Sequence, residues 1–221
     1  MSFALADFNR TEEQCEFRDM IRRFFEEHAP MTETRRVMES DSGVSSDLWK
    51  RASEELGLAG LAIPEEADGQ GFGLVELGIA LGEVGRGLAP LPLFASAGLA
   101  GRAVASVAAG ADANEWLSAI ATGGLATLAR VEAGGDWSPA ATRCEASGSG
   151  DDVRLSGEKH FVVDGRDADR LFVVARSAGS TGADGLGLYA VEANAQGVSR
   201  QPVESLDITR KLAIHGLIQR Q

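Results

Sequence analysis

The hydrophobic period of this 221-residue chain changes near Gly123, and that change limits the possible folds more than any other feature. Before Gly123, apolar residues recur at steps of three and four, which is the spacing of amphipathic helices. After it, short apolar runs alternate with clusters of glycine, aspartate and serine, which is typical of strands and turns. We therefore predict an α+β multidomain chain, with an all-α domain over residues 1–122, a β domain over 123–213 and an atypical tail at 214–221.

Helical signals are clear in the first half. Thr11 and Gln14 form a capping-box pair in front of an apolar helical pattern, and Pro30 marks the end of that pattern. Further helices are predicted over residues 46–56, 74–88, 95–107 and 112–122.

Glycines form a small-residue face on the helix predicted at residues 74–88. Gly78, Gly82 and Gly85 lie at helical spacing, and glycine costs about 1 kcal/mol relative to alanine inside a helix. Close approach of another backbone would compensate that cost, so we expect a neighbouring element against this face.

The second half contains several short β-rich runs without intervening helices. Such a series predicts an antiparallel sheet or a small barrel. The predicted strands are Leu125–Glu132, Val153–Ser156, His160–Val163, Leu171–Arg176, Leu186–Glu192 and Val198–Val203.

Charge and composition exclude several partners. The net charge is −12, the sequence pI is about 4.7 and no basic patch is visible, so we expect no nucleic-acid partner. The most apolar stretch, residues 88–109, is interrupted by two prolines and Arg102, so no membrane span is predicted. Residues 1–10 lack a leader pattern, and the two cysteines fit no metal or redox pair, so we expect a cytoplasmic protein.

The sequence lacks the familiar catalytic signatures. Gly69-Gln-Gly-Phe-Gly73 has the glycines of a nucleotide loop, but no strand precedes it and no βαβ unit follows, so we interpret it as a connecting loop. His28, His160 and His215 are scattered without metal-ligand spacing, and no Gly-x-Ser-x-Gly elbow is present. The residues by themselves therefore predict no catalytic or metal site.

Several motifs, taken in order, nevertheless resemble one family. They are Leu56-Gly-Leu-Ala-Gly-Leu-Ala-Ile-Pro-Glu65 with the glycine loop after it, Glu83–Pro90, Ala129-Arg-Val-Glu132 with Gly134-Gly-Asp136, Gly157-Glu-Lys-His-Phe-Val-Val-Asp-Gly165 and Leu206-Asp-Ile-Thr-Arg210. Each motif alone is weak, and residues 157–165 are the strongest match. As a set they resemble the acyl-CoA dehydrogenase family over most of the chain.

The resemblance implies a helical N-terminal domain and a β middle domain that hold FAD and an acyl-CoA substrate. In that family a carboxylate base removes a proton next to the thioester, and the flavin takes a hydride from the neighbouring carbon. The residues implied to contact the flavin are Leu128, Ala129, Arg130, Val131, Glu132, Phe161, Val162 and Val163.

Three of these positions depart from the family pattern. Phe161 stands where the family usually has tryptophan, and it still supplies an aromatic face. Val131 and Val163 stand where threonines are usual, so the backbone N–H groups remain but the hydroxyls are lost. Alternating apolar positions are also what any sheet core shows, and that second interpretation stays open. Glu132 corresponds to a loop acid of the family, not to its base.

The family continues after its middle domain into a helical bundle that carries the catalytic base, so we expect no catalytic residue in this truncated chain. Three hypotheses follow. The chain is an acyl-CoA dehydrogenase-like flavoprotein that is inactive alone or depends on a partner, such as a full-length acyl-CoA dehydrogenase subunit. It is a non-catalytic subunit that docks such a relative, or it is an oxidase of the same superfamily. We expect an oligomer if the protein is functional.

Overall fold

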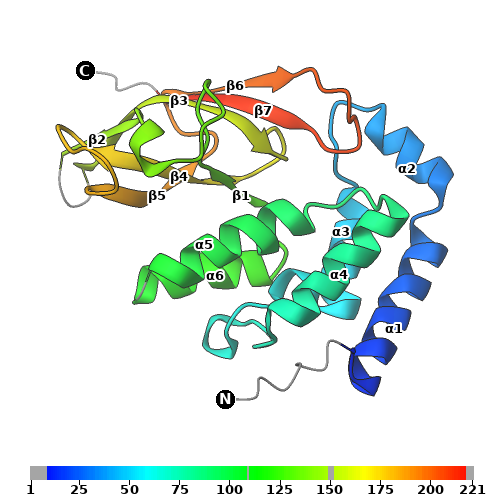
Figure 1. The fold of residues 1–221 in the computed structure, drawn as a ribbon. Helices are drawn as coiled ribbons and strands as arrows, with labels where there is room; N and C mark the ends of the chain where they lie inside the picture. The colour runs from blue at the N-terminus through cyan, green and yellow to red at the C-terminus, as the bar shows by residue number, and fades with distance from the viewer. Residues whose placement is uncertain (1–8, 109, 149–151, 218–221) are drawn as a thin grey trace, which may run out of the picture.

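The computed structural model describes residues 9–108, 110–148 and 152–217, and Figure 1 shows a helical part followed by a sheet. The predicted fold class is confirmed. Within the described ranges, no helix has both the length and the apolar character needed to cross a membrane. The expectations for a leader and for the end of the tail fall on residues 1–8 and 218–221, which lie outside the described residues.

The helical part consists of α-helices joined by short turns, with a π-helical segment at Phe94–Gly101 that leads directly into α5. Short 3-10 turns occupy Leu58–Gly60 and Glu65–Ala67. The helix bounds are α1 Glu12–His28, α2 Met31–Met38, α3 Ser46–Leu56, α4 Leu74–Gly87, α5 Arg102–Val107 and α6 Ala111–Ala121.

Local capping explains why these helices begin and end where they do. The Thr11 hydroxyl accepts a hydrogen bond from Gln14 N at 3.2 Å, and the Gln14 side chain accepts one from Thr11 N at 3.1 Å, which confirms the capping box. Ser45 caps α3, and Gly57 ends it in the left-handed region with φ of 64°. The sequence-based bounds of α3 therefore match the structure.

The sheet is mostly antiparallel and does not close, so the small-barrel alternative is not realised. Its order is β1-β4-β2-β3-β7-β6, and β5 also pairs with β4. The strands are β1 Ala126–Ala129, β2 Glu145–Ser147, β3 Arg154–Val163, β4 Arg170–Ser177, β5 Leu186–Glu192, β6 Val198–Val203 and β7 Leu212–Leu217.

Two pairings depart from the antiparallel expectation, because β1 and β2 both run parallel to β4. Ala126–Ala129 pair with residues 170–173, and Glu145–Ala146 pair with residues 176–177. Both strands thus follow β4 in one direction, and residues 130–144 leave the sheet and then rejoin it. We call residues 130–144 the excursion loop.

The two runs predicted at 153–156 and 160–163 form one continuous strand, β3. The pairing of β3 with β7 shifts register between Lys159 and Val162. Phe161, within this irregularity, has φ of 55°, in the left-handed region. A β-bulge of this kind bends the strand and redirects a side chain, which explains why the pattern looked interrupted.

Strand β7 was not among the predicted strands, and it crosses the expected boundary at residue 213. Its residues pair with both β3 and β6, and Ala213, His215 and Leu217 are buried. The His215 Nε2 lies 2.9 Å from the carbonyl oxygen of Gly165. Burial lowers the pKa of His215 to about 4, because a charged imidazole is poorly solvated there.

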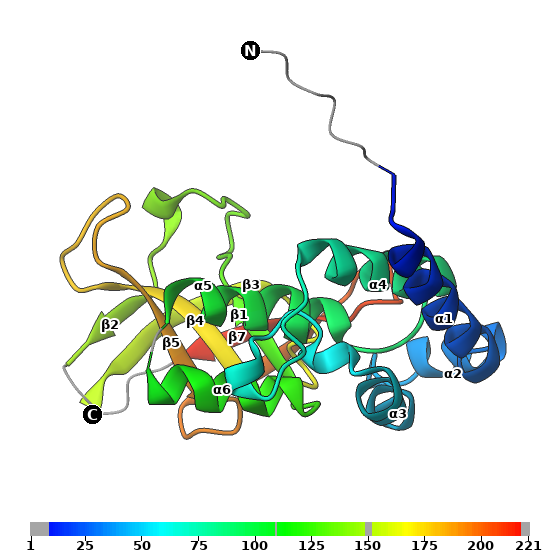
Figure 2. The same ribbon diagram turned by 90° about the horizontal axis from the view of Figure 1, so that it is seen from below.

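Helices α5 and α6 lie against one face of the sheet, and Figure 2 looks onto them in front of β1, β4 and β5. Phe172 of β4 is fully buried there and meets Trp116 of α6 edge to face, with 5.7 Å between ring centroids. A second apolar cluster, which includes Ala129, Val162 and Leu171, fills the interior of the sheet part.

Turns of the sheet part also contact the helical part, at the junction near α2 and α4. The contacts are Lys211 Nζ to Met38 O at 2.6 Å, Gly43 N to Asp167 Oδ2 at 3.3 Å, and Arg210 to the carbonyls of Ala89 and Leu91 at 3.2 and 3.4 Å. Charged side chains of the sheet part thus hold backbone groups of the helical part.

Asp164 lies beside this junction, in the turn after β3, with φ of 51°. The residue is 2% exposed, and neither of its carboxylate oxygens has a hydrogen-bond partner among the described residues. Burial raises the pKa of this carboxyl to about 6; the positive charge of Arg210 opposes the rise, and Asp167 adds to it.

The glycine-rich segments differ from each other in their surroundings. A methyl group added at Gly78, Gly82 or Gly85 would meet no described atom within 4 Å, so the neighbour expected against this face is not found in the described structure. In the loop at 69–73, by contrast, Gly71 N and Phe72 N donate to carbonyls inside the helical part. Those amides are already used, which agrees with a connecting loop and not a phosphate cradle.

Candidate functional site

The segment that follows β1 lies directly beside β3. His160 N donates to the carbonyl of Val131 at 2.8 Å, and the Thr127 hydroxyl donates to the carbonyl of Val163 at 2.7 Å. The two stretches that sequence analysis singled out, 128–132 and 157–165, are therefore neighbours in space.

Side chains at these positions divide into buried and accessible groups. Ala129, Val131 and Val162 are buried, and Ala129 and Val162 belong to the apolar cluster of the sheet part. Leu128 and Val163 are half-buried. Phe161 is 46% exposed, so its ring is open to a ligand while its neighbour Val162 fills the core.

The conformation of Phe161 is costly for a residue with a side chain. A left-handed backbone costs roughly 1–2 kcal/mol outside glycine, and aromatic residues rarely adopt it. At φ of 55° the bulge exposes the ring between two residues whose side chains point inward or lie half-buried. Strain of this kind concentrates at functional sites in proteins.

Backbone donors without a partner among the described residues lie on the segment that pairs with His160, the residue before Phe161. No described residue accepts a hydrogen bond from the backbone N–H of Val131 or of Glu132. Val131 is joined through its own carbonyl to His160, the residue before Phe161. The arrangement thus offers an accessible aromatic face and two unused N–H groups on adjacent segments.

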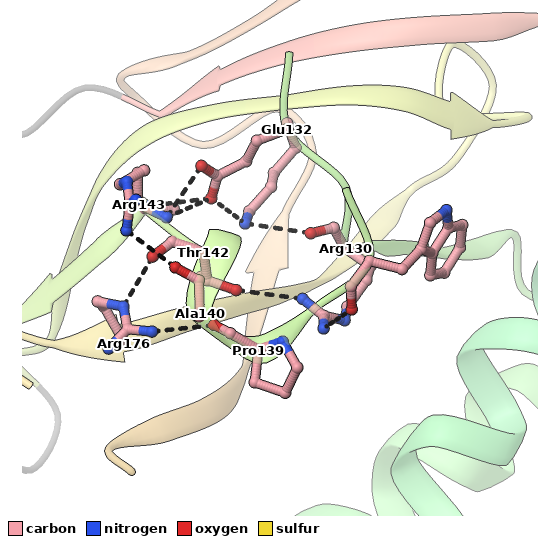
Figure 3. A network of polar contacts seen from close by, with 10 residues as sticks. Arg130, Glu132, Pro139, Ala140, Thr142, Arg143 and Arg176 are labelled. Atoms are coloured by element: carbon pink, nitrogen blue, oxygen red, sulfur yellow. Dashed lines mark hydrogen bonds and ion pairs between the residues drawn. The ribbon is translucent and has the colours of Figure 1, made fainter. Parts of the chain in front are cut away.

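The acid of the motif, Glu132, is held in an ion pair (Figure 3). Its Oε1 lies 2.7 Å from Nζ of Lys159, and the carboxylate also accepts from Arg143 N and Cys144 N, each at 2.9 Å. Burial opposes ionisation, but the Lys159 ammonium and the two backbone N–H groups outweigh it, so the pKa of Glu132 is lowered. A carboxylate so occupied is unsuited to act as a general base.

Arginines hold the rest of the excursion loop. Arg130 donates to the Thr142 hydroxyl at 3.1 Å and to the Trp137 carbonyl at 2.7 Å. Arg176 of β4 donates to the carbonyls of Thr142 at 2.7 Å and Pro139 at 3.0 Å, as Figure 3 shows. The Arg130 guanidinium therefore binds groups inside the loop, so we expect any ligand contact of this residue to come from its backbone.

In the described part of the chain, no cluster of three or more His, Cys, Asp or Glu side chains is placed to bind a metal ion. The site is thus made of an aromatic ring, apolar side chains and backbone groups. Such a lining suits a flat, mostly apolar ring with polar edges.

Both halves of the chain match models of known domain families. The family described as acyl-CoA dehydrogenase, N-terminal domain, matches residues 11–124, and the family described as acyl-CoA dehydrogenase, middle domain, matches residues 128–218. The chain belongs to the acyl-CoA dehydrogenase family. The resemblance drawn from the sequence motifs is thereby confirmed.

Among curated acyl-CoA dehydrogenases, FadE12 of Mycobacterium tuberculosis is 31% identical over 165 residues, covering 72% of this chain and 42% of that protein. The solved Tcur3481-Tcur3483 steroid ACAD G363A variant is 34% identical with a TM-score of 0.81, covering 94% of this chain and 55% of that chain.

Two further solved structures share the fold. The ChsE4-ChsE5 complex from Mycobacterium tuberculosis has a TM-score of 0.82 at 23% identity, covering 96% of this chain and 55% of that chain. The acyl-CoA dehydrogenase complexed with FAD from Bacillus anthracis has a TM-score of 0.80 at 23% identity, covering 95% of this chain and 37% of that chain. This chain spans between 37% and 55% of the length of these four relatives.

Sequence reasoning missed one residue of the candidate site. Lys159 lies inside the motif at residues 157–165, and it is fully buried and pairs with Glu132. A lysine in the middle of an alternating apolar strand was the available signal, because a buried ammonium needs an anion.

Proposed function

We propose that this chain binds FAD against the surface formed by residues 128–132 and 161–163 and contributes that surface to the dehydrogenation of an acyl-CoA thioester. The observation that carries the proposal is Phe161, a strained and accessible aromatic residue next to the unused N–H groups of Val131 and Glu132. In this arrangement the ring of Phe161 would flank the isoalloxazine, and the N–H groups would meet its polar edge.

The residues present fit FAD in shape and fit it less well in hydrogen bonding. Val131 and Val163 carry no hydroxyl, so each forgoes a side-chain hydrogen bond worth about 0.5–1.5 kcal/mol. Backbone donors and the aromatic face remain. We therefore expect flavin binding that is weaker than two threonines would allow.

Bound FAD would supply the acceptor for a hydride from the acyl chain. The chain's own residues bind and orient the ring and keep water away from one face of it. Proton removal is assigned to a carboxylate other than Glu132, because Glu132 is committed to Lys159 and to two backbone N–H groups. We propose that a partner, such as a full-length acyl-CoA dehydrogenase subunit, supplies that base and completes the acyl-CoA site.

Two comparisons support dependence on a partner. The Tcur3481-Tcur3483 variant and the ChsE4-ChsE5 complex, two structures that share this fold, are each named for two components. A second candidate function, a non-catalytic subunit that docks such a relative, is favoured by the missing hydroxyls at Val131 and Val163. Flavin binding separates the two candidates.

The test is an equilibrium titration of FAD into the purified chain, followed by flavin fluorescence and visible absorbance, alone and with a full-length relative. Saturable binding is expected, and Phe161→Ala should weaken it about tenfold, which corresponds to the loss of one ring contact. Phe72→Ala is the matched control, since Phe72 is a 51% exposed aromatic that stacks on Phe17 in the helical part. No saturable binding in either setting would exclude the flavoprotein proposal and leave the docking subunit.

A further inference from the structure

Lys159 has one of the largest side chains among the fully buried residues of the described structure. It stands on β3, with its Nζ 2.7 Å from Glu132 Oε1 and 3.4 Å from the carbonyl oxygen of Arg130. Burying an ammonium is expensive, and a buried ion pair usually adds little net stability over a well-packed apolar pair. Stability alone therefore does not account for this pair.

The pair joins three segments at one carboxylate. Glu132 lies near the start of the excursion loop, Arg143 and Cys144 lie at its end, and Lys159 lies on β3. Both ends of the loop are thus tied to the same strand through a single side chain. The side chain of Cys144 is fully buried under this contact.

The same contact fixes the two elements of the candidate flavin surface. Val131 stands between Arg130 and Glu132, which both contact Lys159, and Phe161 follows Lys159 by two residues on β3. The spacing between the Val131 N–H group and the Phe161 ring is therefore set by how the loop sits on the strand.

We propose that the Lys159–Glu132 pair is a positioning clamp that holds the excursion loop on β3 and so sets the distance between the backbone donors of 131–132 and the ring of Phe161. In its consequence for FAD, this inference rests on the proposed function. The side chains of Lys159 and Glu132 act through the loop and touch neither the ring nor the substrate.

The decisive variant is Lys159→Met/Glu132→Leu, which replaces the ion pair with apolar side chains of similar length and leaves no unpaired charge in the interior. The matched control is Arg22→Met/Glu83→Leu, which removes the ion pairs of Glu83 with Arg22 and with Arg86, each at 2.8 Å, in the helical part. Three quantities are measured in each protein: melting temperature, the FAD dissociation constant, and the labelling rate of Cys144 by a thiol reagent with Cys15 as the internal reference.

The clamp predicts that the decisive variant folds with a melting temperature within a few degrees of wild type, labels Cys144 at least about tenfold faster, and binds FAD about tenfold more weakly. The control should change neither the labelling nor the FAD affinity. If the pair served stability alone, a decisive variant with an unchanged melting temperature would also bind FAD with unchanged affinity. That result would overturn the proposal.

Two further readouts keep the inference testable. If the wild-type chain binds no FAD, the proposed function fails, and Cys144 labelling alone decides the clamp: faster labelling in the decisive variant supports it, and an unchanged rate overturns it. If the variant does not fold, hydrogen exchange on the wild-type chain decides. The amides of Arg143 and Cys144 should exchange as slowly as those of β3, and rapid exchange at both overturns the clamp.

Discussion

Replacing Asp164 with asparagine is expected to stabilise the chain at neutral pH and to do little in acid. The carboxyl of Asp164 is buried without a hydrogen-bond partner among the described residues. Asparagine removes the charge, keeps the shape and tolerates the left-handed backbone at this position better than most residues. The buried amide lacks partners as the protonated carboxyl does, so the effect reports on the charge.

The size of the effect follows from the pKa. Burial raises the pKa of Asp164 from its ordinary value of 3.8 to about 6, so the native chain holds a proton that the unfolded chain has already released. The stability of the wild type therefore falls as the pH rises from about 4 to about 6 and stays low above that. At about 1.4 kcal/mol per pKa unit the full penalty is about 3 kcal/mol, of which roughly 2 kcal/mol develops between about pH 4 and about pH 8.

Urea unfolding of wild type and Asp164→Asn at about pH 4 and about pH 8 measures this penalty. The stability difference between the two proteins should grow by roughly 2 kcal/mol from acid to base in favour of the variant. Asp184→Asn is the control, because it removes an exposed carboxylate that does not contribute to the raised pKa of Asp164. A difference between Asp164→Asn and wild type that does not change with pH would refute the assignment of the raised pKa to this carboxyl.

Three further outcomes follow from the packing. Phe172→Ala should lower the free energy of unfolding by about 3–5 kcal/mol, since the ring is fully buried against Trp116; a loss below about 1 kcal/mol in a denaturation curve would contradict that packing. Burial raises the pKa of the Cys144 thiol to about 11, so a thiol reagent at about pH 8 should modify Cys15 first. Equal modification rates of the two cysteines, measured by peptide mass spectrometry, would be inconsistent with a buried Cys144 thiol. Burial lowers the pKa of His215 to about 4, so the native state loses stability as the pH falls below about 6.5. His215→Gln should therefore flatten the fall in the free energy of unfolding over that pH range. An identical fall in both proteins would argue against a buried neutral imidazole.

Local sequence signals predicted the helices and strands whose capping residues and hydrophobic period lie within the element itself. Helix α3 follows from Ser45 and Gly57, and strands β5 and β6 match the predicted ranges. These features depend on residues close in sequence, so a pattern can show them. The fold class followed from the same kind of evidence.

Long-range pairing explains what the sequence could not reveal. Strand β7 depends on partners in β3 and β6, and the parallel pairing of β1 and β2 depends on both meeting β4. The open face of Gly78, Gly82 and Gly85 also depends on what lies beside α4, which helical spacing does not determine.

The candidate site shows the same division. The two segments that the motifs singled out are neighbours in space, but the pairing of Glu132 with Lys159 joins residues 27 positions apart and no local pattern predicts it. The accessible ring of Phe161 depends on a bulge that interrupts the strand pattern. The assignment of all eight residues to flavin contact stays a prediction.

The measurement that tests the account most directly is the amide NMR spectrum of the chain with increasing FAD. We predict that the amide signals of Val131, Glu132 and Val163 shift together and saturate, and that adenosine diphosphate alone leaves them in place. If FAD leaves these three amides unchanged, or shifts only residues in the helical part, then the surface between β1 and β3 is not a flavin site.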